Sequence, residues 1–208
     1  MPAKDTPTVE FPDRSAWERW LEANHASSPG VWLKLPKKGS GAGTVTKGER
    51  SGAGTITKAE ALEEAIRYGW IDGQVRRHDD AFWLQRFTPR GPRSKWSQVN
   101  RRKATELIEQ GRMRPAGLAQ VEAAKNDGRW DAAYAPQSTV AVPDDFQRAL
   151  DANPEADEFF ATLKRSERYS FLYRIYDAKR PETRARRIRD YVAMLADGKT
   201  IHGRAGGD

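Results

Sequence analysis

The stretch Arg86-Phe87-Thr88-Pro89-Arg90-Gly91-Pro92-Arg93-Ser94-Lys95-Trp96-Ser97 marks the boundary between the predicted strands and the later predicted helices of this chain. Its prolines fix the backbone angle φ and remove amide donors, which excludes a helix interior or a central strand. We therefore predict a rigid, basic surface connection that leaves a hairpin and enters a helix beginning near Ser97. Surface connections often carry functional residues.

Short strands are predicted before this connection. Residues 31–35, Val-Trp-Leu-Lys-Leu, have the alternating pattern of a strand, and residues 74–77 and 81–87 are typical of a hairpin around His78-Asp79-Asp80. The segment Trp70-Ile71-Asp72-Gly73 is predicted to turn the chain into this hairpin. A sheet of about three strands is near the minimum that is stable, so helices are expected to cover it.

Helices are predicted before, between and after these strands. The first begins near Asp13 or Ser15, where Ser15-Ala16-Trp17-Glu18 matches a capping box. A second follows the capping box Thr57-Lys58-Ala59-Glu60 and ends before Gly69. Apolar periodicity with glycine and proline boundaries predicts further helices at residues 97–109, 115–126, 144–152, 155–163, 167–178 and 181–198.

The predicted fold class is therefore α+β and predominantly helical. A small antiparallel sheet of about three strands is covered by helices and followed by a C-terminal helical bundle. The expected divisions are a disordered N-terminus (1–10), an α+β domain (11–135), a C-terminal helical region (143–202) and a tail (203–208). The helical region either packs with the first domain as one unit or forms a separate domain.

A Gly-rich loop at residues 39–56 interrupts the first domain. It contains the repeat Gly41-Ala42-Gly43-Thr44-Val45-Thr46-Lys47, which is nearly copied by Gly52-Ala53-Gly54-Thr55-Ile56-Thr57-Lys58. The repeat is too short and too rich in glycine for a solenoid. The P-loop spacing that ends in Gly-Lys-Ser/Thr is absent. A tandem duplication inside a flexible loop explains the pattern best.

Composition excludes several classes of protein. The 208 residues include no cysteine, which excludes disulfides, thiolate nucleophiles and cysteine-based metal sites. No apolar run approaches the roughly 18 residues of a membrane helix, and the first residues lack the apolar core of a signal peptide. We therefore expect a cytoplasmic protein without a membrane span. The net charge of +7 favours anionic partners, although solubility alone explains it equally well.

The sequence contains no recognisable catalytic motif. The three histidines, His25, His78 and His202, are not paired at helical metal-binding spacing, and no Gly-x-Ser-x-Gly motif is present. We expect no metal and no cofactor. Asp72 is the best single carboxylate for acid–base chemistry, because it follows Trp70 in the predicted turn. The alternative is that Asp72 caps its own turn through nearby backbone amides.

Two basic runs are candidates for contact with anions. In residues 86–103, Trp96 and Asn100 lie one helical turn apart among several arginines and no acidic residue. This pattern suits stacking and charge pairing with a nucleotide, single-stranded nucleic acid or an aromatic anion; the alternative is a solvated helix start with Trp96 in the core, as is usual for a tryptophan. Residues 179–189 form the second run, for which a solvated helix face is the simplest interpretation.

Several strings together resemble one bacterial family. They are Val31-Trp32-Leu33, Gly69-Trp70-Ile71-Asp72, Gln85-Arg86-Phe87-Thr88-Pro89-Arg90, Gly128-Arg129-Trp130-Asp131 and Ala178-Lys179-Arg180-Pro181-Glu182-Thr183-Arg184. Over residues 9–202 the chain resembles the YdeI/OmpD-associated, bacteriocin-protection family. The resemblance implies a connection with tolerance of antimicrobial peptides and with an outer-membrane porin. It supplies no catalytic residues, and the duplicated loop is longer than the family's usual connection.

These observations predict a non-catalytic, cytoplasmic binding protein that protects against an antimicrobial or envelope stress. Its partner would be a small anionic or aromatic ligand or an antimicrobial compound; the oligomeric state is left open. One alternative is a nucleic-acid-binding module that uses the runs 86–103 and 179–189, and another is an enzyme with Asp72 as acid or base. The residues predicted to line the ligand site are Trp70, Asp72, Arg86, Arg90, Trp96 and Asn100.

Overall fold

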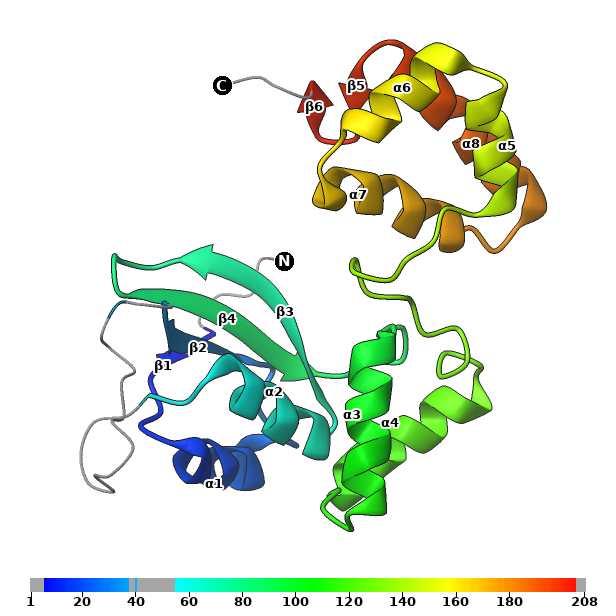
Figure 1. The fold of residues 1–208 in the computed structure, drawn as a ribbon. Helices are drawn as coiled ribbons and strands as arrows, with labels where there is room; N and C mark the ends of the chain where they lie inside the picture. Colours follow the sequence, from blue (N-terminus) through cyan, green and yellow to red (C-terminus); the bar gives the residue numbers. More distant parts are fainter. Residues whose placement is uncertain (1–5, 38–39, 41–54, 205–208) are drawn as a thin grey trace. The chain divides into compact units, whose positions relative to one another are not determined.

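The computed structural model describes residues 6–37, 40 and 55–204, and its helices and strands are shown in Figure 1. The chain separates into two compact units, residues 1–133 and 134–208. Within the described ranges, the first unit holds the main sheet and helices α1–α4, and the second holds helices α5–α8. The internal repeat predicted in the Gly-rich loop lies mostly outside the described residues.

A four-stranded sheet organises the first unit. Its strands are β1 (Thr8–Val9), β2 (Val31–Pro36), β3 (Trp70–Arg77) and β4 (Phe82–Pro89), in the order β1-β2-β4-β3. The β2–β4 and β3–β4 pairs are antiparallel as predicted, whereas β1 adds a parallel strand to β2. β1 lies in the segment expected to be disordered, and it is held there by a 2.8 Å hydrogen bond from the Trp32 amide to the Pro7 carbonyl.

The turn predicted over residues 70–73 is wrong, because β3 already begins at Trp70. The chain reverses instead at Gly69, whose φ of 74° is a left-handed conformation that favours glycine. A bulge follows within β3, between Asp72 and Val75. The buried Gln85 amide donates hydrogen bonds to the Gly73 carbonyl at 2.9 Å and the neighbouring Gln74 carbonyl at 3.3 Å. It thereby satisfies acceptors near the interrupted ladder.

The hairpin turn at residues 78–80 is confirmed. The Asp79 carboxylate accepts hydrogen bonds from the amides of Ala81 at 2.9 Å and Phe82 at 2.7 Å. β4 then runs to Pro89, further than predicted, because residues 87–89 still pair with β3. The first four residues of the basic stretch therefore belong to a central strand, and the surface connection begins at Arg90.

Helices α1 (Arg14–Asn24) and α2 (Lys58–Arg67) pack on one face of the sheet (Figure 1). Asp13 caps α1 by accepting a 2.7 Å hydrogen bond from the Ala16 amide, which confirms Asp13 of the two predicted starts, whereas the capping box expected at Ser15 is wrong. The capping box at Thr57 is confirmed. Trp17 is fully buried between the two helices and donates a 3.0 Å hydrogen bond to the Ala61 carbonyl.

Helices α3 (Gln98–Glu109) and α4 (Pro115–Asn126) complete the first unit beside α2 (Figure 1). The predicted start of a helix near Ser97 is confirmed. Ser97 caps α3 by accepting a 3.1 Å hydrogen bond from the Asn100 amide. Gly117 brings α4 close to the end of α2, since a Cβ on this glycine would overlap the carbonyl oxygen of Arg67. The two helices therefore meet backbone to backbone.

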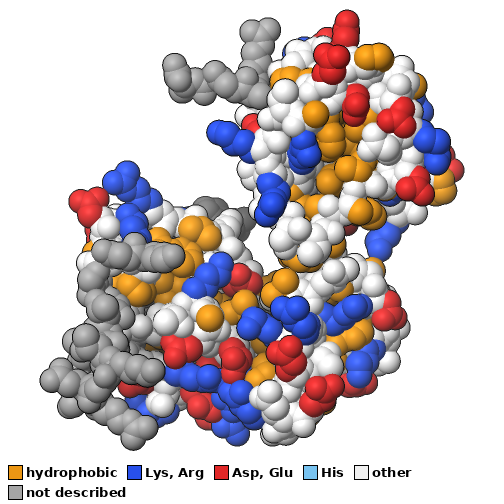
Figure 2. Space-filling model, in the orientation of Figure 1, with side chains coloured by type: hydrophobic (Ala, Val, Ile, Leu, Met, Phe, Trp, Pro, Cys, Tyr) orange, Lys and Arg blue, Asp and Glu red, His pale blue; other side chains and the backbone are white. Residues whose placement is uncertain are grey.

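A network of ion pairs joins α1, α2 and the connection between α3 and α4. At its centre lies Glu64, whose side chain is fully buried and binds Arg14 Nε at 2.5 Å and the Arg67 guanidinium. Burial alone would raise the pKa of the neighbouring Glu63, but hydrogen bonds from Arg14 and Arg112 outweigh burial and lower it. Figure 2 shows acidic and basic side chains interspersed over the region of these helices.

The second unit is a small helical bundle. Phe146, Phe160 and Phe171 form its centre together with Ile175 and Leu195. Its helices lie within two residues of their predicted boundaries, and a short β5–β6 pair follows them. The elements are α5 (Asp144–Asp151), α6 (Pro154–Thr162), α7 (Arg165–Tyr176), α8 (Pro181–Ala196), β5 (Lys199–Thr200) and β6 (Gly203–Arg204).

The two units together confirm the α+β, mainly helical fold class. Within the part of the chain that the structure describes, every helix is too short or too polar to cross a membrane.

Candidate anion-binding face of the sheet

Strand alternation divides the side chains of the sheet between two faces. In the β2–β4 register, Val31 pairs with Phe87 and Leu33 pairs with Gln85, and these side chains lie on the face toward α1 and α2. The residues between them project from the opposite face, which we call the outer face. Its members are Trp32, Lys34, Arg76, Phe82, Leu84 and Arg86.

The outer face contains two buried apolar side chains that belong to neither hydrophobic core. Trp32 is 6% exposed and Leu84 is 9% exposed, yet both are absent from the two core clusters. The Arg76 guanidinium lies over the Trp32 ring, 4.4 Å from its centroid. A cation–π contact at an exposed arginine contributes only about 0.5–1 kcal/mol, so a ligand can displace Arg76 from the ring at low cost.

The cations of the outer face differ in how well they are compensated. Lys34 Nζ lies 4.0 Å from the centroid of the Phe82 ring and 3.1 Å from a carboxylate oxygen of Glu10. Arg76 and Arg86, by contrast, form no ion pair with any residue in the described ranges. The outer face therefore carries two uncompensated positive charges beside Trp32.

Arg86 has a hydrogen-bond donor that the fold leaves unused. Its Nη1 lies 3.5 Å from Gln74 Oε1, at the limit of a hydrogen bond. Its Nε is buried and has no hydrogen-bond partner among the described residues. A buried donor without a partner costs about 1–3 kcal/mol, so the Arg86 side chain gains by turning toward an anionic oxygen at the surface of the sheet.

The structure places Trp70 and Asp72, the two predicted site residues on β3, away from Arg86. Trp70 is 1% exposed, and its Nε1 donates a 3.1 Å hydrogen bond to the His25 carbonyl in the core. Asp72 pairs with Phe87 on the helix-covered face, and its carboxylate lies 3.8 Å from Lys58 Nζ. Asp72 is thus neither in a turn nor on the face that carries Arg86.

Arg90 and Trp96 lie in a third place, on the connection from β4 to α3, and the buried Asn100 lies in the first turn of α3. The Arg90 guanidinium lies over the Trp96 ring at 3.6 Å from its centroid, and Trp130 packs edge-on against the same ring at 4.9 Å. Arg90 Nη1 also donates a 3.2 Å hydrogen bond to the Lys95 carbonyl. Arg90 and Trp96 therefore stack on each other, and the structure brings these two of the six predicted residues into contact.

Of the six residues named for the outer face, only Arg86 was among the predicted site residues, and the central pair that was missed is Trp32 and Arg76. Trp32 could have been identified by alternation, because Val31 and Leu33 on either side of it face the core. Arg76 lies two strands away, and its contact with Trp32 depends on the strand order β2-β4-β3 and on the bulge. No local pattern in the sequence gives that register.

The second basic run is partly structural. Arg184 binds Asp145 through two hydrogen bonds of 2.6 Å and 2.8 Å, and this contact lowers the pKa of the Asp145 carboxyl. Arg187 donates a hydrogen bond to the Arg174 carbonyl on α7. These two arginines join helices, whereas Arg189 remains exposed on α8. Across the described ranges, no cluster of three or more His, Asp or Glu side chains is arranged to hold a metal ion.

Two family models match the chain. Residues 9–120, more than half of the sequence, match the model of a domain of unknown function, DUF8412. The chain belongs to this family. Residues 139–198 match a second model, described as Bacteriocin-protection, YdeI or OmpD-Associated, which confirms in the second unit the resemblance drawn from the sequence. Searches of the curated proteins and of the solved structures gave no match.

Proposed function

We propose that this DUF8412 protein is a non-catalytic, cytoplasmic binding protein that protects against an antimicrobial or envelope stress. The match of residues 139–198 to the bacteriocin-protection family supports the protective role. The observation that carries the binding site is the pair Arg76 and Arg86, which form no ion pair in the described ranges and lie on the same face of the sheet as Trp32. These three side chains favour a ligand that combines an anionic group with an apolar or aromatic part.

The chemistry of the outer face explains this choice of ligand. A carboxylate, sulfate or phosphate group would accept hydrogen bonds from Arg86 and Arg76, which carry no ion pair in the described ranges. Displacement of Arg76 would open the Trp32 ring to an aromatic or apolar group, with Leu84 beside it. Binding of this kind needs no turnover, since sequestration alone lowers the free concentration of the ligand.

The double variant Arg76→Glu/Arg86→Glu is expected to lose both the ligand and the protection. Charge reversal replaces two donors by two carboxylates, which repel an anion. The loss of one charged hydrogen bond alone should weaken the affinity for the ligand by at least about tenfold. Native mass spectrometry of the purified protein measures co-purified ligand. The minimal inhibitory concentration of antimicrobial peptides in a complemented deletion strain measures protection.

The matched control is Arg19→Glu/Arg148→Glu, which makes the same change of charge at two exposed helical sites. The control is expected to keep the ligand mass and the protection of the wild type. Equal protection by the outer-face variant and the control would place the function elsewhere in the chain.

A second candidate function is the binding of single-stranded nucleic acid on the same face. It is favoured by Trp32 and Phe82, which lie on neighbouring strands and are each covered by a cation. Aromatic side chains on a basic sheet are a common platform for stacking of bases.

A gel-shift titration with an unstructured oligothymidine of about 20 nucleotides tests this candidate, since such binding tolerates any sequence. If it is correct, the logarithm of the binding constant falls by about 0.7 per contacted phosphate for each unit of log salt concentration. Weak binding without a steep salt dependence would reject the nucleic-acid candidate and leave the small anionic ligand.

A further inference from the structure

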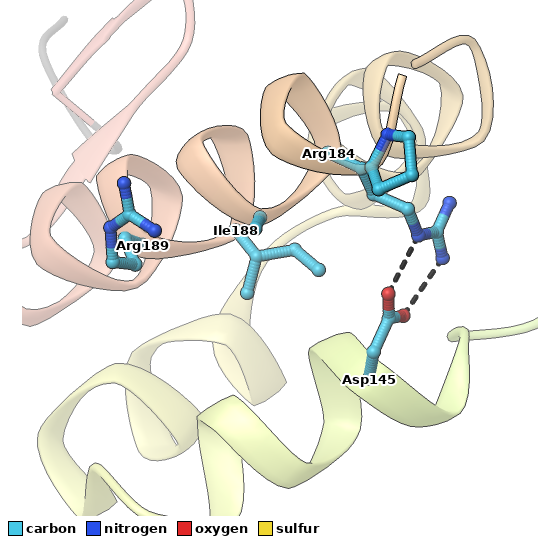
Figure 3. A pocket seen from close by; sticks show the side chains of 6 residues that line it. Asp145, Arg184, Ile188 and Arg189 are labelled. Atoms are coloured by element: carbon cyan, nitrogen blue, oxygen red, sulfur yellow. Dashed lines mark hydrogen bonds and ion pairs between the residues drawn. The ribbon is translucent and has the colours of Figure 1, made fainter. Parts of the chain in front are cut away.

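The second unit contains a shallow groove of about 410 Å³ beside α8, which is separate from the outer face of the sheet. Figure 3 shows Ile188 between Arg184, which is bound to Asp145, and Arg189 further along the helix. The proposed function assigns no role to this groove, although most of its lining belongs to the second basic run, residues 179–189. It is lined by Asp145, Pro181, Arg184, Ala185, Ile188 and Arg189.

The apolar lining of the groove follows one side of α8. Pro181, Ala185 and Ile188 are spaced four and three residues apart, which places them on one helical face. Pro181 and Ala185 are exposed, and Ile188, at 7% exposure, reaches into the core. The strip covers two turns of α8, about 10 Å, which is the length over which a second helix can pack against it.

Of the arginines around the apolar strip, one is paired with a carboxylate and two are not paired within the described residues. At one end, the Arg184 guanidinium is held by Asp145 and by a 3.0 Å hydrogen bond to the Ile175 carbonyl. At the other end, Arg189 has no ion pair in the described part of the chain, and the same holds for the exposed Arg186 nearby. Residues 179–190 contain six basic and two acidic side chains, so the exposed surface around the strip is positive.

We propose that this groove docks an acidic amphipathic helix of a partner protein. Apolar side chains of the partner would pack on Pro181 and Ala185, and its carboxylates would pair with Arg189 and Arg186. The apolar strip favours a peptide over nucleic acid, because a phosphate backbone has no group to bury against it. The positive rim favours an acidic helix over a basic one, since like charges at a rim repel.

The test uses the full chain and a fluorescein-labelled amphipathic peptide of about 14 residues, roughly four helical turns, built of leucine and glutamate. Fluorescence anisotropy measures its dissociation constant. Ala185→Glu places a carboxylate on the apolar strip while keeping a good helix former, and Arg189→Glu reverses the rim charge. Each variant is expected to weaken binding by at least about tenfold, and added salt should weaken binding to the wild type.

Two controls make the outcome decisive. Arg165→Glu makes the same charge change at an exposed site on α7 and should bind the peptide as the wild type does. A peptide with lysine in place of glutamate should not bind. The proposal is overturned if the acidic peptide fails to bind at millimolar concentration, or if Arg165→Glu weakens binding as much as Arg189→Glu. It is also overturned if sedimentation shows that Ala185→Glu abolishes self-association, which would make a second copy the occupant.

Discussion

Replacement of Glu64 by alanine is expected to lower the free energy of unfolding of the first unit by about 3 kcal/mol. The Glu64 side chain is fully buried between Arg14 and Arg67, whose side chains are 34% and 11% exposed. Removing a buried carboxylate leaves its cationic partners without compensation, which typically costs about 3–5 kcal/mol. The lower end applies here because Arg67 keeps a contact with Glu18 at 3.0 Å and Arg14 keeps one with Glu63 at 2.6 Å.

The measurement is urea-induced unfolding followed by tryptophan fluorescence. All seven tryptophans lie in residues 1–133, so their fluorescence reports on the first unit alone. Glu122→Ala is the matched control, because it removes an exposed glutamate whose 2.9 Å ion pair with Lys125 is solvated on both sides. The control should change stability by no more than about 0.5 kcal/mol. Equal unfolding midpoints for the two variants would contradict a stabilising role for the buried network.

Glu64 also illustrates what could not be predicted from the sequence. Features set by near neighbours were predictable: the capping box at Thr57, the end of α2 before Gly69 and the hairpin turn at Asp79 each depend on residues within a few positions. The burial of Glu64 depends instead on Arg14, fifty residues away in the sequence. Periodicity alone assigns a glutamate on a helix to solvent, because the pattern contains no information about a distant arginine.

Strand register decides which of the predicted site residues on the sheet share a face. Trp70 and Asp72 were predicted in a turn that leads into the hairpin, and Arg86 was predicted in the second strand of that hairpin, so the three were expected to line one site. In the observed register Asp72 pairs with Phe87, so Arg86, the next residue along β4, must project from the other face. Because Asp72 pairs with the neighbour of Arg86 and not with Arg86 itself, the two side chains lie on opposite faces of the sheet. The bulge between Asp72 and Val75 sets this register and has no signature in the sequence beyond a single glycine.

Replacement of Gly117 by alanine is expected to destabilise the first unit, although the same change in an ordinary helix interior is favourable by about 1 kcal/mol. The added Cβ would overlap the Arg67 carbonyl oxygen and lie 2.7 Å from Met113 Cε. The carbonyl belongs to the backbone at the end of α2 and cannot rotate away, so α4 must move. We expect a net loss of about 1–3 kcal/mol, typical of overpacking, in the same fluorescence-detected unfolding.

Gly91→Ala is the control, because no atom lies within 4 Å of the added Cβ and the change should leave the unfolding midpoint nearly unchanged. A midpoint for Gly117→Ala at or above that of the wild type would show that α4 is not held against α2.

The contact between Gly117 and the Arg67 backbone also predicts that the effects of changing Gly117 and Glu64 are coupled. A shift of α4 away from the Arg67 backbone disturbs the buried ion pair that Glu64 forms with the Arg67 side chain. The double variant Glu64→Ala/Gly117→Ala should therefore lose less stability than the two single losses combined, because neighbouring sites that share a partner are not additive.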